Sequence, residues 1–171
     1  IYNHTLLLRD HGRYRNKNLK EIRKCFGFNS RLDNIHAAIA LIKLKKFNKW
    51  IVQRRKIAKI YHSHLKFIPE IKIPLFSNGD DKFYDTYNSY VIRTKKRNAL
   101  KNFLLKNGIE VFSHIDKGVH LEKNLKVGKW NLPKTEEIEK QIISLPIYPE
   151  LRRSKQLYII YKIREFFKKW K

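Results

Sequence analysis

The longest uninterrupted pattern in the sequence is an apolar stripe of helical period between Asp33 and Leu65. Residues 33–44 are predicted to be a helix, because Asp33 is a good N-cap and apolar residues recur every three or four positions. The stripe then continues as a straight or kinked helix with lysine and arginine opposite it. Its members are Ile35, Ala38, Ile39, Ile42, Phe47, Trp50, Ile51, Ile57, Ala58, Tyr61 and Leu65. The face that bears the first four of these residues is predicted to be buried.

The pattern changes after Pro69 and Pro74, which end the helical region. Turn residues follow at 77–81, so we place a boundary there between two lobes, residues 1–75 and 76–171.

In the second lobe, residues 88–94 and 109–112 are predicted to be strands. They flank a helix at 97–107 that ends at Gly108. A helix near Thr135 and a last helix after Ser154 complete this lobe. The last helix aligns Ile159, Ile163, Phe166 and Trp170. The predicted class is therefore α/β, with long helices followed by a small α+β domain.

The net charge of +24 raises the alternative of a nucleic-acid partner, because basic surfaces attract phosphates. Lysine outnumbers arginine, however, and isoleucine and asparagine are abundant, a mixture that A/T-rich coding sequence produces without selection for binding. The basic residues are also spread along nearly every segment. We therefore predict no specific nucleic-acid partner.

No apolar run approaches the roughly 20 residues that span a bilayer, which predicts no membrane partner. The basic aromatic end between Tyr158 and Trp170 could attach to a membrane surface, but a docked terminal helix explains it more simply. The single cysteine, Cys25, fits a reducing compartment and predicts a cytoplasmic protein. Because the sequence contains no methionine, Ile1 is expected to be an artificial or degraded beginning.

Two segments are candidates for chemistry. Gly27 to Asp33 sets a glycine, an amide and an arginine ahead of a helix, so it is either an anion site or a turn held by its polar side chains. His114 and His120 lie in a loop after a predicted strand, where sites are often assembled, but two loop histidines can equally be solvated. No spacing predicts a metal site or a catalytic residue within the chain.

Several segments match a known family in order and spacing. Residues 8–12 read LRDHG, 27–39 read GFNSRLDNIHAAI, and 44–61 form the second part of the long helix. Residues 90–93 read YVIR, 108–110 read GIE, 114–121 read HIDKGVHL, and 132–151 read LPKTEEIEKQIISLPIYPEL. They resemble, in turn, "LRNHG", "GYNYRMSDIQAAIG", "QLEKLDEFIEKRREIAEIY", "YVIRV", "KGIE", "VHYPIPLHL" and "LPVAEELAERVLSLPLYPEL" of the DegT/DnrJ/EryC1/StrS sugar aminotransferases. Each match is short, but the ordered set is specific.

The resemblance implies the C-terminal part of a fold type I aminotransferase that depends on pyridoxal phosphate. Residues 1–75 would be the end of the large cofactor domain and 76–171 the small domain. Such enzymes move an amino group from glutamate to a keto nucleotide-sugar for surface polysaccharide synthesis, as homodimers with shared active sites. The lysine that carries the cofactor would lie upstream of Ile1, so the chain alone is expected to be inactive.

The resemblance also implies roles for matching residues. Asn29 would reach the cofactor phosphate of the other subunit, and Arg31 would help to bind anionic groups there. His114 and His120 would line the sugar pocket. The chain departs from the family at Ser30, where tyrosine is usual, and at 115–118, where IDKG replaces YPIP. The alternative is an inactive remnant that serves as a dimerisation module or a basic binding module.

Overall fold

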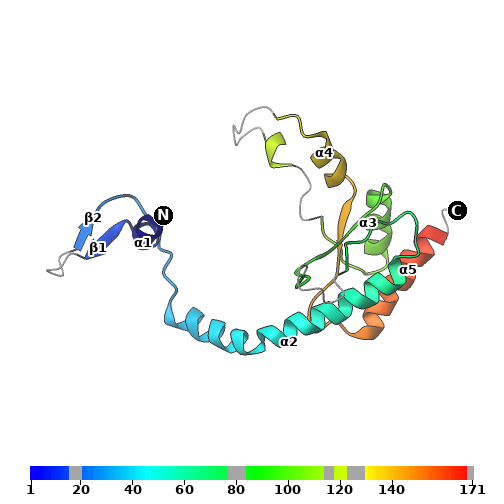
Figure 1. Cartoon of the computed structure of the whole chain (residues 1–171), viewed down its shortest axis with the longest axis horizontal. Coiled ribbons are helices and arrows are strands. Elements are labelled where there is room, and N and C mark those ends of the chain that lie inside the picture. Colours follow the sequence, from blue (N-terminus) through cyan, green and yellow to red (C-terminus); the bar gives the residue numbers. More distant parts are fainter. Residues whose placement is uncertain (16–20, 77–83, 114–117, 123–129, 169–171) are drawn as a thin grey trace. The chain divides into compact units, whose positions relative to one another are not determined.

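The computed structural model describes residues 1–15, 21–76, 84–113, 118–122 and 130–168 (Figure 1). It divides into two compact units, residues 1–47 and 48–171, and the long helix α2 belongs to both. In chain order, the elements are α1 (Tyr2–Leu8), β1 (Arg13–Arg15), β2 (Glu21–Arg23), α2 (Asn34–Leu65), β3 (Tyr90–Arg93), α3 (Arg97–Lys106), η1 (Val119–Leu121), α4 (Pro133–Glu139), β4 (Ile142–Leu145) and α5 (Arg153–Lys168). The predicted boundary between residues 75 and 76 refers to the domains of a complete enzyme of the family, and it stays a prediction.

The first unit contains α1, the antiparallel pair β1–β2 and the beginning of α2. A tight turn at Gly12 joins α1 to β1, and its φ of +71° is one that glycine adopts without strain. A Cβ at Gly12 would also overlap the backbone of Cys25, so only glycine fits this turn.

Helix α2 is one continuous helix of 32 residues, which confirms the helix predicted over 33–44 and its continuation. The backbone N–H of His36 donates to the Asp33 carboxylate at 2.8 Å, so Asp33 caps the helix as expected.

The predicted burial of the first turns of α2 is wrong for this chain. Ile35, Ile39 and Ile42 are 74%, 46% and 59% exposed, because none of the described segments of the first unit covers them. Burial begins further along, at Ile57 and Ala58.

The second unit is built around the buried half of α2 and the antiparallel pair β3–β4. Ile92 pairs with Ile143 at the centre of this sheet, and both side chains are fully buried. Helices α3 and α5 pack beside each other (Figure 1), with the rings of Phe103 and Phe166 5.4 Å apart. Other core residues include Tyr61, Leu65, Tyr90, Leu100, Leu104, Ile159 and Ile163.

Most of the predicted elements of this unit are confirmed, with two corrections. Residues 109–112 are not a strand: they alternate between buried and exposed, but of these residues only Phe112 bridges the sheet, at Ser144. The partner of β3 is instead β4, which the sequence had not indicated. Gly108 ends α3 with a φ of +71°, as its position predicted.

Candidate functional site

The two segments that resemble the family in the first unit lie against each other. The backbone N–H of Phe28 donates to the carbonyl of Leu8 at 2.6 Å, and that of His11 donates to the carbonyl of Phe28 at 3.0 Å. A third bond, 2.9 Å long, joins the N–H of Ser30 to the carbonyl of Arg9. Asn29 is therefore held opposite Asp10 by backbone bonds that do not depend on its own side chain.

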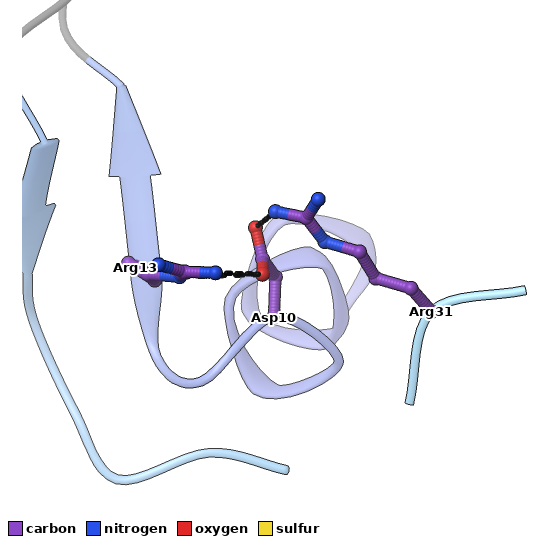
Figure 2. Close-up of polar contacts among 3 residues, drawn as sticks. All are labelled: Asp10, Arg13 and Arg31. Atoms are coloured by element: carbon purple, nitrogen blue, oxygen red, sulfur yellow. Dashed lines mark hydrogen bonds and ion pairs between the residues drawn. The ribbon is translucent and has the colours of Figure 1, made fainter. Parts of the chain in front are cut away.

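An ion-pair cluster fixes the arginine of this segment. Figure 2 shows the Asp10 carboxylate between Arg13 and Arg31, one oxygen facing each guanidinium. Arg13 lies 3.3 Å from Asp10, and Arg31 donates a hydrogen bond to the other oxygen. This bond from Arg31, with a smaller contribution from Arg13, holds the pKa of the Asp10 carboxyl below its ordinary value.

The arrangement leaves donors available to an anion. The Asn29 side chain is exposed, and that of Arg31 is 61% exposed, although it is paired with Asp10. An amide and a guanidinium are groups that bind phosphate oxygens, so both residues fit a cofactor phosphate. Since both lie on the surface of the unit, a phosphate bound there needs further protein to enclose it.

Asp10 and Arg13 were missed as members of this cluster. Asp10 stands where the family segment quoted above has asparagine, and a carboxylate in that position attracts a nearby cation. That substitution was the signal that could have drawn attention to Arg31 as its partner.

The second unit contains the other predicted site residue that can be placed. His120 lies in η1, and its Nε2 faces a carboxylate oxygen of Glu136 in α4 at 3.4 Å. Its side chain is only 7% exposed. His114 lies outside the described residues, so its predicted role is untested.

The second unit also has a groove of about 660 Å³ that contains none of the predicted site residues. It lies between residues 108–112, residues 144–148 and the beginning of α5. Among the described residues, no group of three or more histidine, cysteine or acidic side chains could hold a metal ion. No helix in the described ranges is long and apolar enough to cross a membrane.

Comparison with known proteins identifies the class. The model of the DegT/DnrJ/EryC1/StrS aminotransferase family matches residues 1–164, and the chain belongs to this family. It is 34% identical to a pleiotropic regulatory protein of Geobacillus stearothermophilus over 83% of the chain and 39% of that protein. It is 32% identical to the dTDP-3-amino-3,4,6-trideoxy-alpha-D-glucose transaminase of Streptomyces venezuelae over 82% of the chain and 37% of the transaminase.

A solved structure agrees with this assignment. DesV of Streptomyces venezuelae superposes with a TM-score of 0.83 at 30% identity and covers 97% of the chain, which corresponds to 44% of DesV. The fold predicted from the sequence, the C-terminal part of such an aminotransferase, is thus confirmed. The chain spans about two fifths of the length of the relatives it matches.

Proposed function

We propose that the chain is the C-terminal part of a cytoplasmic aminotransferase that uses pyridoxal phosphate to move an amino group from glutamate to a keto nucleotide-sugar. Its product would serve surface polysaccharide synthesis. The observation that carries this proposal is the pairing of residues 8–12 with residues 27–31, which presents Asn29 and Arg31 together on the surface of a chain of this family. Pyridoxal phosphate, when bound, supplies the electron sink that amino transfer requires.

Asn29 and Arg31 would hold the phosphate of that cofactor. The amide of Asn29 would donate a hydrogen bond to a phosphate oxygen, and Arg31 would add positive charge beside it. Asp10 keeps the Arg31 side chain in place and neutralises part of its charge. The lysine that carries the cofactor is supplied by protein outside residues 1–171, and no lysine of the chain is given this role.

The apolar face at the beginning of α2 supports a homodimer. Its exposed isoleucines, Ile35, Ile39 and Ile42, lie on the helix that begins three residues after Arg31. By family resemblance Asn29 would lie against the other subunit's cofactor, so this face would be continuous with the expected contact between subunits. A second subunit is therefore the partner that we propose for it.

The first test is the coding sequence upstream of the codon for Ile1. An in-frame segment that supplies a cofactor lysine would give a complete enzyme, whereas stop codons would support the alternative of an inactive remnant. The complete enzyme should release 2-oxoglutarate from glutamate when a keto nucleotide-sugar is present. No release with any dTDP-, UDP- or GDP-linked keto-sugar would contradict the proposed reaction.

The second test concerns Asn29. Asn29→Ala in the complete enzyme should weaken cofactor binding about tenfold or more, because a hydrogen bond to a charged group is worth about 1.5–3 kcal/mol. Asn48→Ala is the matched control, since Asn48 is also exposed and lies on α2. Equal cofactor affinity in the two variants would remove Asn29 from the site.

His120 would bind the sugar, and His114 keeps its predicted role in the same pocket. His120→Ala should raise KM for the nucleotide-sugar more than KM for glutamate. A rise confined to glutamate would contradict the assignment.

A further inference from the structure

Two glutamates of α4 surround the short segment that carries His120. The Glu136 carboxylate faces Nε2 of His120 at 3.4 Å. One turn further along α4, the Glu139 carboxylate accepts a hydrogen bond of 2.5 Å from the backbone N–H of Gly118. Both Gly118 and Glu139 are buried, and in Figure 1 the segment η1 lies next to α4.

A side chain at position 118 would displace the imidazole of His120. The φ of −61° and ψ of 138° of Gly118 are angles that proline adopts, and the family segment quoted above has proline here. A Cβ at this position, however, would lie 2.5 Å from Cε1 and 2.7 Å from Nδ1 of His120. Proline would also lack the N–H that Gly118 donates to Glu139. The glycine therefore lets the imidazole pack on its Cα and provides the hydrogen bond to α4.

Helix α4 is itself fixed to the rest of the second unit. The Arg97 guanidinium, at the beginning of α3, donates to the backbone carbonyls of Glu139 and Lys140 at 3.4 and 3.3 Å. The Glu139 side chain is thus anchored at the end of α4 that is tied to α3. A continuous set of contacts leads from α3 through Glu139 to the backbone just before His120.

The contact with Glu136 also favours one of the two tautomers of His120. A carboxylate beside Nε2 favours a proton on that atom, and in the neutral ring this leaves Nδ1 as a hydrogen-bond acceptor. Nδ1 is the atom that a side chain at position 118 would crowd. An acceptor nitrogen suits a ligand that offers a hydroxyl proton, as a sugar does.

We propose that Glu136 and Glu139 are positioning residues that fix His120 with its Nε2–H toward α4 and its Nδ1 available to a sugar hydroxyl. Glu139 holds the backbone that leads into η1, and Glu136 sets the tautomer of the ring. The inference rests on the proposed function only for the identity of the ligand as a sugar. The placement of His120 by the two glutamates is independent of it.

The tautomer is tested by nitrogen-15 NMR of the imidazoles in the labelled chain, with His120→Asn used to assign the signal. We expect the Nε2–H tautomer in the wild type, retained in Glu136→Gln, whose amide oxygen also accepts the proton. Glu136→Ala should give a mixture of tautomers. Glu137→Gln is the matched control on the same helix and should leave the signal unchanged. An Nδ1–H tautomer in the wild type, or no change in Glu136→Ala, would overturn the role of Glu136.

Hydrogen exchange of the Gly118 amide tests Glu139. Glu139→Met fills the buried volume without an acceptor and should lower the protection of this amide at least tenfold, whereas Glu139→Gln should stay within twofold of the wild type. Unchanged protection in Glu139→Met would refute the contact. If that variant unfolds, Gly118→Ala tests the contact between position 118 and the imidazole of His120. A shift of the His120 Cε1–H resonance is expected, and an unmoved resonance contradicts the inference.

In the complete enzyme, Glu136→Ala should raise KM for the nucleotide-sugar at least fivefold, and Glu136→Gln should restore it. If the enzyme transfers no amino group to sugars, the proposed function fails while the NMR results stand. If transfer occurs but neither glutamate variant alters His120, the proposed function stands and this inference alone is lost.

Discussion

Removal of the Arg54 side chain should destabilise the second unit. Arg54 projects from the buried half of α2, and its Nη1 donates to the carbonyl oxygens of Tyr87, Asn88 and Ile147 at 3.2, 3.0 and 2.9 Å. Two of these carbonyls precede β3, and the third follows β4. Arg54→Met keeps the apolar stem and removes the donor from both segments at once.

The magnitude follows from the geometry. Nη1 has two protons, so its three contacts count as two hydrogen bonds, each worth about 1.5–3 kcal/mol for a charged donor. The carbonyl of Asn88 is at an exposed position and can bond to water after the substitution, which lowers the loss. We expect Arg54→Met to reduce the free energy of unfolding by about 3 kcal/mol.

The assay is urea unfolding followed by tryptophan fluorescence, because Trp50 and Trp130 belong to the second unit. With an m value of about 2 kcal/mol per molar, the midpoint of Arg54→Met should fall by about 1.5 M. Lys59→Met removes an exposed charge from the same helix and should change the free energy of unfolding by less than about 0.5 kcal/mol. A midpoint for Arg54→Met equal to that of Lys59→Met would refute the reasoning.

Three further outcomes are expected. In carbon-13 NMR the Asp10 carboxyl should titrate below its ordinary pKa of 3.8, and in Arg31→Gln its pKa should return toward that value. Because the pKa is lower in the folded state, the ion pair stabilises the fold at pH values above the pKa of the unfolded state. This stabilisation is lost as the pH falls through the pKa of the folded state. Burial raises the pKa of the Tyr61 hydroxyl above its ordinary value of 10, so the neutral hydroxyl stabilises the fold below pH 10 and this stabilisation is lost as the pH rises further. An alkaline absorbance titration of Tyr61→Phe should lack one late-ionising tyrosine that the wild type shows. Gly108→Ala should lower the free energy of unfolding by about 1 kcal/mol, because the φ of this residue is positive. Gly12→Ala should lower it by more and abolish amide protection in the first unit, because a Cβ at Gly12 meets the backbone of Cys25, whereas one at Gly108 meets nothing.

Elements with a strong local signal were predictable from the sequence. Helix α2 has a capping aspartate and a long apolar stripe, and α3 ends at a glycine. Strand β4 was missed because Ile142 to Leu145 is mostly buried and shows no alternation. The pair β1–β2 was missed because its strands are short and rich in charged residues, which give no apolar period.

The candidate site was predictable only in part, because its decisive contacts are not local. The resemblance implies roles for Asn29 and Arg31, but the pairing of Arg31 with Asp10 joins residues 21 positions apart. The contact of Gly118 with Glu139 likewise joins two segments whose proximity depends on how α4 packs. The exposed face of α2 was misjudged, since an apolar stripe predicts that a face is covered without showing which protein covers it.

In the proposed enzyme, Asn29 and Arg31 complete a cofactor site whose lysine belongs to protein outside these 171 residues. The most direct measurement is to incubate the isolated chain with equimolar pyridoxal phosphate, reduce with borohydride and locate any adduct by mass spectrometry. We expect only scattered, substoichiometric modification of surface lysines. One lysine modified in a one-to-one ratio would contradict it, because the chain would then contain the anchoring residue itself.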